Sequence, residues 1–263
     1  NSLIDTKFVV MLCDDEIYLP SSLKASISFL KKNPDYSSCK GLCIGFRRNY
    51  FSSRLEGVMD YLSLRNYVID ADDPFERVIK HFSPYTVASI YAVHRKEVYD
   101  KFTKILSFER VYSAGASWEI QLSIITAVIG KIKVLDQLMW FRNRENATLS
   151  GSDTVPPWIW IQDQQYSKEI KYFIEDFEKI FPNEPKIKNC VRKTLEVYSS
   201  GYDKLKKKKL KLFLKKLFFE FWSFLYEPIK CLIRPLIRTN KRFIDVAIEL
   251  KKTNININMT ELK

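Results

Sequence analysis

The pattern that most limits the fold of this chain is an alternation of apolar, β-branched runs with segments of helical period over about its first 140 residues. Strands are expected at Phe8–Leu12, Ser38–Phe46, Thr86–Val93 and Lys131–Trp140. Helices are expected between them, beginning at Pro20, Lys96 and Trp118, with Gly130 closing the last one as a C′ residue. Such alternation is typical of an α/β layer, in which helices flank a mostly parallel sheet. After Pro156-Pro157 the pattern becomes helical, which predicts a helical C-terminal extension.

The formal charge of +12 is concentrated near the C-terminus. Residues 204–263 hold 16 Lys/Arg and 5 Asp/Glu, a net +11, so residues 1–203 contribute about +1. We therefore expect a domain over residues 1–150, a helical extension over residues 151–203 and a basic tail over residues 204–263. A basic groove for nucleic acid on residues 1–203 is not expected, because that part of the chain is nearly neutral.

The five cysteines are spread along the chain, which predicts buried thiols in a reducing compartment. Only Cys39 and Cys43 lie close together, and without a second pair we expect no zinc site. The chain starts at Asn1 and enters the strand at Phe8 almost at once. We therefore expect an incomplete N-terminus, and the missing segment would carry part of any active site.

Three acids, Asp14, Asp15 and Glu16, directly follow the first expected strand. Carboxylates fixed at a strand end can hold Mg²⁺ or Mn²⁺, which prefer hard oxygen ligands. Such a cation can neutralise the charge of a departing nucleoside diphosphate. The alternative is a solvated acidic turn, and most isolated acidic triplets are of that kind.

The surrounding sequence favours the metal-binding interpretation. Phe8–Pro20 contains a hydrophobic strand, the acids, a hydrophobic pair and a proline that opens a helix, and it resembles the aspartate-rich motif region of family 2 glycosyltransferases of the GT-A fold. Phe29–Tyr36 resembles the helix end that follows in this family, and Tyr91–Arg95 resembles a segment of one bacterial branch. The resemblance covers residues 1 to about 150 and implies a GT-A-like, Rossmann-like, mostly parallel sheet. In this sequence Glu16 stands where the family more usually has aspartate, and the family's first strands are absent.

The resemblance also implies roles for particular residues. Asp14, Asp15 and Glu16 would hold Mn²⁺ or Mg²⁺, and Asp14 would also bind the nucleotide-diphosphate sugar that serves as donor. Glu119, near the start of an expected helix, is the counterpart of the family's catalytic base, which takes the proton of the acceptor hydroxyl. The alternative is a glutamate that caps its own helix. The family's second acid is missing here, because Trp118 precedes Glu119.

Two arginines follow the last expected strand. Arg142 and Arg144 could hold the donor diphosphate through bidentate hydrogen bonds, with a solvated strand exit as the alternative. His94 and Arg95 would line the same cleft, although a lone histidine is more often a structural residue. The sequence contains no Ser-His-Asp arrangement, no glycine-rich phosphate loop and no zinc-spaced cluster, so nothing in it supports the corresponding hydrolase, kinase and zinc-enzyme classes.

The basic tail contains an amphipathic pattern between residues 205 and 226. Its apolar face carries Leu210, Phe213, Leu214, Leu217, Phe221, Phe224 and Leu225, and lysines dominate the opposite face. Charged residues interrupt the run before ~18 apolar residues are reached, so we expect no membrane span. A lysine face beside a Phe/Leu face is typical of a helix that lies on anionic lipid. Packing of the apolar face on the domain is the alternative, and segregation of aromatics from lysines disfavours nucleic acid.

Together these features predict a glycosyltransferase for a cell-envelope polysaccharide, cytoplasmic and peripheral on the inner face of the cell membrane. Its expected partners are a nucleotide sugar, a glycan or lipid-linked acceptor and an anionic membrane surface, with no nucleic acid. The rival interpretation is a non-catalytic, membrane-attached binding module on a degenerate glycosyltransferase fold.

Overall fold

The computed structural model describes residues 4–14, 16–49, 54–60, 64–144, 155–201 and 243–245. The helices are α1 (Pro20–Lys32), α2 (Pro74–His81), α3 (Lys96–Leu106), α4 (Ser117–Ile129), α5 (Pro157–Gln162), a short 3₁₀ helix (Gln164–Tyr166), α6 (Ser167–Ile180) and a last helix over residues 187–201. The strands are β1 (Phe8–Val9), β2 (Glu16–Tyr18), β3 (Tyr36–Asn49), β4 (Arg54–Asp60), β5 (Val68–Ile69), β6 (Val93–Arg95), β7 (Lys131–Asn143) and β8 (Phe243–Asp245).

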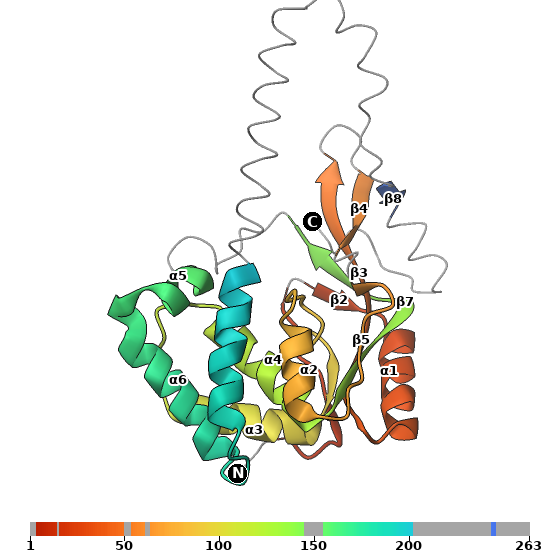
Figure 1. Ribbon diagram of the computed structural model, residues 1–263. Helices are drawn as coiled ribbons and strands as arrows, with labels where there is room; N and C mark the ends of the chain where they lie inside the picture. The colour runs from red at the N-terminus through yellow and green to blue at the C-terminus, as the bar shows by residue number, and fades with distance from the viewer. Residues whose placement is uncertain are drawn as a thin grey trace, which may run out of the picture.

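The eight described strands form one strongly curled sheet built around two long central strands, β3 and β7 (Figure 1). β6 and then β4 pair with one edge of β3, whereas β5 and β2 pair with the outer edge of β7. β1 extends the sheet beyond β6, and β8 pairs with β4. Of the pairings between described strands, β3 with β7 is the parallel one, and the others are antiparallel.

The predicted mostly parallel, GT-A-like or Rossmann-like sheet is therefore wrong. That prediction assumed that each strand is followed by a helix, which allows the chain to cross over and return in the same direction. Residues 49–76, whose polar and acidic sequence predicts a long excursion or lid, instead contain β4 and β5. β4 follows β3 after a short connection, and such a connection can only join antiparallel strands.

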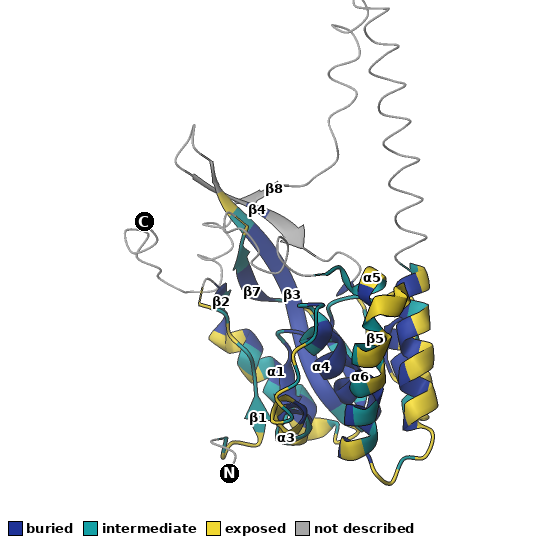
Figure 2. Ribbon diagram, turned by 90° about the vertical axis from the view of Figure 1, so that its left-hand side faces the viewer, coloured by how far each residue is buried: buried dark blue, intermediate teal, exposed yellow. Residues whose placement is uncertain are grey.

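β3 separates two apolar layers because successive side chains on a strand point to opposite faces. Leu42 belongs to the cluster that contains α4, whereas Cys39 and Cys43 pack with Leu30 of α1. α1 and α4 accordingly cover opposite faces of the sheet (Figure 1). Figure 2 shows the buried stretch of β3 between these layers and the exposed outer faces of the helices.

Two glycines permit close approach of backbone segments. A Cβ atom on Gly41 would lie 2.5 Å from the Met139 Cβ and 2.6 Å from the Gln137 carbonyl oxygen, where the register of β3 and β7 shifts. A Cβ on Gly130 would lie 2.7 Å from the Ser37 amide nitrogen. Gly130 has an extended backbone, so its role after α4 is to leave space and it does not form the expected left-handed C′ residue.

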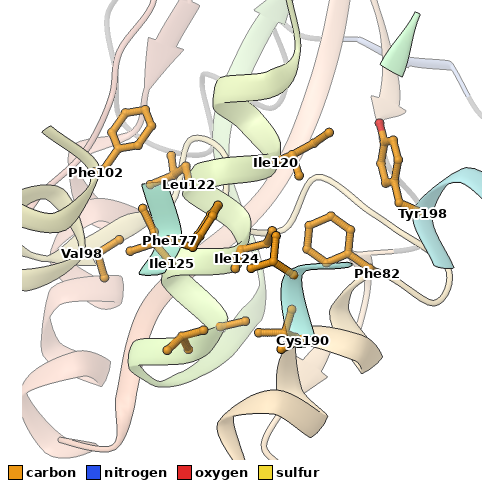
Figure 3. Close-up of a cluster of buried hydrophobic side chains, with 14 of the residues drawn as sticks. Phe82, Val98, Phe102, Ile120, Leu122, Ile124, Ile125, Phe177, Cys190 and Tyr198 are labelled. Atoms are coloured by element: carbon orange, nitrogen blue, oxygen red, sulfur yellow. The ribbon is translucent and has the colours of Figure 1, made fainter. Parts of the chain in front are cut away.

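α4 is buried almost all round, which its nearly continuous apolar sequence requires. It packs among α2, α3 and the sheet, and the same cluster contains Phe177 of α6 together with Cys190 and Tyr198 of the last helix (Figure 3). The helices over residues 157–201 therefore share one hydrophobic core with the preceding residues. Within the part of the chain that the structure describes, no helix is long and apolar enough to cross a membrane.

Candidate functional site

The acidic segment does not present its carboxylates as one group. Glu16 opens β2 and lies directly opposite Arg142 of β7. Its side chain is only 2% exposed, and its Oε1 lies 3.8 Å from the Arg142 Nε. Asp14 is exposed, and Asp15 lies outside the described residues. Two of the three predicted metal ligands thus differ in environment, one paired with an arginine and one at the surface.

Glu119 lies in the first turn of α4, within electrostatic range of Arg142 and Lys40. Burial raises the pKa of the Glu119 carboxyl, and the charges of Arg142 and then Lys40 oppose that rise. Arg142 therefore interacts with both Glu16 and Glu119. Ala116 is the N-cap residue of α4 and provides no side-chain hydrogen bond, so the described geometry is not that of a capping box.

Lys40 of β3 is a member of this site that the sequence analysis missed. Its side chain is fully buried, and its Nζ donates to the carbonyl oxygens of Val87 and Ile90, each at 2.8 Å. The ammonium also lies 5.0 Å from the ring centroid of Trp140. Burial lowers the pKa of Lys40 to about 7, with Cys43 and Glu16 the first of the groups that oppose the lowering. The available signal was a single lysine in the otherwise uncharged part of this strand that precedes Arg47 and Arg48.

We refer to Glu16, Lys40, Glu119 and Arg142 as the charged cluster. An aromatic wall made of Tyr18, Tyr91 and Trp140 lies beside it, with Tyr91 and Trp140 ring centroids 4.7 Å apart and Tyr18 stacked on Trp140 at 6.2 Å. Burial, reinforced by nearby acidic groups, raises the pKa of the Tyr18 hydroxyl well above its usual value. The wall is therefore neutral, and it gives the charged cluster a low-dielectric side, which strengthens electrostatic interactions within the cluster.

The segment that leads into α4 is held by α6. The Glu169 carboxylate accepts hydrogen bonds from the Ser113 amide at 2.8 Å, the Ser113 hydroxyl at 2.7 Å and the Trp160 indole at 2.7 Å. Two helical turns further along α6, Asp176 accepts a hydrogen bond from the Tyr112 hydroxyl at 2.7 Å. Burial opposes ionisation of Glu169, but the hydrogen bonds from Ser113 and Trp160 outweigh it and lower the pKa of this carboxyl. These contacts fix the chain a few residues before Glu119.

The other predicted site residues fall into different roles. Arg144 is exposed, and its backbone amide donates to the Phe46 carbonyl oxygen at 2.9 Å. His94 is fully buried, and its Nε2 donates to the Ser89 carbonyl oxygen at 2.8 Å. Burial lowers the pKa of His94 to about 3, so the ring is neutral.

Arg95 also has a structural role in place of the expected one in the cleft. Its guanidinium donates to the carbonyl oxygens of Leu30, Asn33 and Tyr36 at 2.6 to 3.0 Å, where α1 ends and β3 begins. Arg95 therefore stabilises the fold around the end of α1, whereas the His94 side chain contacts the Ser89 carbonyl oxygen and the ring of Tyr99 in α3. Trp118 packs against the large hydrophobic cluster.

No metal-binding geometry is complete among the residues that the structure describes, where no group of three or more His, Cys, Asp or Glu residues could hold an ion. Comparisons of the chain with protein-family models, with curated proteins and with solved structures find no match. The function must therefore be inferred from the charged cluster and from the sequence around it.

Proposed function

We propose that this protein is a glycosyltransferase that moves a sugar from a nucleotide-diphosphate sugar to a glycan or lipid-linked acceptor in cell-envelope polysaccharide synthesis. The observation that carries the proposal is the position of Glu119. This carboxylate has a raised pKa and lies beside Arg142, which in turn pairs with Glu16 of the acidic segment. Such a transfer needs a proton acceptor, a positive side chain that binds the diphosphate, and a metal-binding motif nearby. Glu119, Arg142 and the acidic segment would fill these three roles.

Glu119 would take the proton of the acceptor hydroxyl while the hydroxyl oxygen attacks the anomeric carbon of the donor. The bond between that carbon and the diphosphate oxygen breaks, and the diphosphate leaves with both bonding electrons. A raised pKa makes a carboxylate a stronger base, and the charges of Arg142 and Lys40 help to keep it ionised near neutral pH. Arg142 would exchange its long contact with Glu16 for contact with the diphosphate.

Asp14 and Asp15 are the residues that would hold Mn²⁺ or Mg²⁺. The exposed carboxylate of Asp14 is a hard oxygen ligand and fits either ion, and Asp15 adjoins it in the sequence. When bound, the cation neutralises charge on the leaving diphosphate. Glu16 would add negative charge near the ion without binding it, since its side chain is directed at Arg142.

The basic tail supports a position on the cytoplasmic face of the cell membrane, where lipid-linked acceptors are found. Its amphipathic pattern lies outside the described residues and remains a prediction from the sequence. A peripheral attachment would hold the charged cluster near acceptors that diffuse in the bilayer surface.

The proposal is tested with the full-length protein, Mn²⁺ and a panel of uridine, guanosine and thymidine diphosphate sugars. Release of nucleoside diphosphate and binding of the donor are measured separately. We expect Glu119→Gln to lower turnover by roughly 10²- to 10⁴-fold and to leave donor affinity nearly unchanged, because only proton abstraction is lost. Glu97→Gln is the matched control, since Glu97 is an exposed glutamate in the first turn of α3.

A second substitution tests the metal ligands. Asp15→Ala should abolish the Mn²⁺-dependent part of nucleotide binding without unfolding the protein. If donors bind but no diphosphate is released with any of them, the rival binding module is favoured. Equal loss of binding and turnover in Glu119→Gln would identify a structural glutamate.

A further inference from the structure

Lys40 is fully buried, which is rare for a lysine side chain. A charged group removed from water is unfavourable unless hydrogen bonds compensate it, and here the carbonyl oxygens of Val87 and Ile90 provide two. Both carbonyls belong to the turn that precedes β6. β3 is therefore fixed to this turn through one side chain.

The turn ends at Tyr91, which has a left-handed backbone with φ of 61°. This conformation is uncommon for a residue with a bulky side chain and persists only where surrounding contacts hold it. The Tyr91 carbonyl oxygen lies 3.0 Å from the Tyr18 hydroxyl, and the Tyr91 hydroxyl accepts a hydrogen bond from the Cys13 thiol at 3.4 Å. The Tyr18 hydroxyl is also 3.0 Å from the Met11 carbonyl oxygen, so it can donate to either carbonyl.

Cys13 and Tyr18 lie on either side of the acidic segment. Tyr91 thus contacts both ends of the segment, and Lys40 holds the turn that presents Tyr91. We propose that Lys40 is a positioning residue, which acts through the 87–91 turn and Tyr91 to fix the acidic segment between Cys13 and Tyr18. This role deepens the proposed function, on which its catalytic consequence rests, but the mechanical link itself can be tested without any substrate.

Lys40 also acts on the site through its charge. The titratable groups that interact with it are Cys43 on its own strand, Glu16 of β2, Arg142 of β7 and Glu119 of α4. The positive charge of Lys40 lowers the pKa of Glu119 against the effect of burial. Replacing Lys40 by an uncharged residue should therefore move the acid limb of the turnover profile to higher pH, which loss of the turn alone would not do.

The experiment measures hydrogen exchange of backbone amides by mass spectrometry, in the full chain without ligand. In Lys40→Met we expect exchange to become at least about tenfold faster in two separate segments. Residues 86–92 lose the two hydrogen bonds from Lys40, and residues 11–18 are then held less firmly because their contacts to Tyr91 depend on the position of this turn. Lys24→Met is the matched control, since Lys24 is an exposed lysine of α1, and it should change neither segment. Tyr18→Phe should accelerate exchange in residues 11–18 alone.

Faster exchange in residues 86–92 of Lys40→Met with no change in residues 11–18 would overturn the proposal, as would unchanged exchange in Tyr18→Phe. If Lys40→Met does not fold, Lys40→Leu, which also lacks a side-chain donor, takes its place in the same comparison. Absence of sugar transfer in the wild-type protein would contradict the proposed function but leave the exchange result interpretable. The positioning role of Lys40 and the proposed glycosyltransferase function can therefore be contradicted independently of each other.

Discussion

Replacing Lys40 by methionine should change how the stability of the protein depends on pH. Methionine is about as long as lysine and carries no charge, so the substitution removes a titrating group from the interior while largely preserving its volume. Burial lowers the pKa of Lys40 from its usual 10.5 to about 7 in the folded state. In the unfolded chain the side chain is in water and has its usual pKa.

The sign of the effect follows from proton binding in the two states. Between pH 7 and 10.5 the unfolded chain keeps the Lys40 proton, whereas the folded protein has largely released it. Stability rises with pH wherever the unfolded state binds more protons, so Lys40 makes the wild type more stable as the pH rises through this window. The gap of about 3.5 pH units, at ~1.36 kcal/mol per unit, sets an upper limit of about 5 kcal/mol, of which about 3 kcal/mol falls between pH 7 and 9.5.

Urea unfolding at a series of pH values measures this difference, with the slope of each transition used to check that the unfolded states remain comparable. Other titrating groups are common to both proteins, so the difference between wild type and Lys40→Met isolates Lys40. We expect that difference to grow in favour of the wild type as the pH rises from 7 to 9.5, and to stay flat for Lys24→Met. A difference independent of pH would refute the reasoning, because it would mean that Lys40 titrates as it does in water.

Two further predictions concern other parts of the chain. Glu169→Ala should reduce the free energy of unfolding by about 3 kcal/mol, because three donors from Ser113 and Trp160 lose a carboxylate partner. The control is Glu178→Ala on the same helix. It removes only an exposed ion pair with Lys188 and should reduce the free energy of unfolding by less than about 1 kcal/mol. Similar losses in the two variants, measured by urea unfolding, would show that Glu169 does not anchor the segment before α4. The basic tail should bind vesicles of anionic lipid, with binding that weakens as salt is added and weakens further when Phe221 and Phe224 are replaced by serine. If deletion of residues 204–263 instead unfolds the remainder in a circular dichroism melt, this part of the chain belongs to the folded domain, through its apolar face or through β8.

Local sequence signals predicted α1, α3 and α4, whereas α2 (Pro74–His81) was not expected. Pro20 opens α1 as expected, and the helix ends at Lys32 with Asn33 as its C-cap residue. The serines after Pro20, which the sequence pattern offers as a helix cap, do not cap α1, because Ser22 lies inside the helix and its hydroxyl donates to the Leu138 carbonyl oxygen. α3 begins at Lys96, and α4 begins one residue before the expected Trp118. These features depend on residues close together in the sequence, so periodicity and proline geometry are sufficient to find them.

The direction of the strands could not be predicted in the same way, because pairing joins residues far apart in the sequence. β1, β2 and β5 are two or three residues long, too short to show an alternating pattern, yet each pairs antiparallel with its neighbour. In the site, the sequence led to Glu119 and Arg142 through motif position, and the structure brings both within electrostatic range of Lys40. Lys40 itself was missed because its function depends on carbonyls of a turn almost fifty residues away.

The proposed function depends most on Glu119 as the proton acceptor, and the pH dependence of donor-saturated turnover tests this directly. Because Glu119 must be ionised to accept a proton and its pKa is raised by burial, turnover in the wild type should rise with pH along a limb centred above the ~4.3 of an ordinary glutamate. In Glu119→Gln the remaining turnover should be lower by roughly 10²- to 10⁴-fold and should lack this limb, whereas Glu97→Gln should retain both rate and limb. The same limb and the same turnover in Glu119→Gln would contradict the assignment of Glu119 as the base.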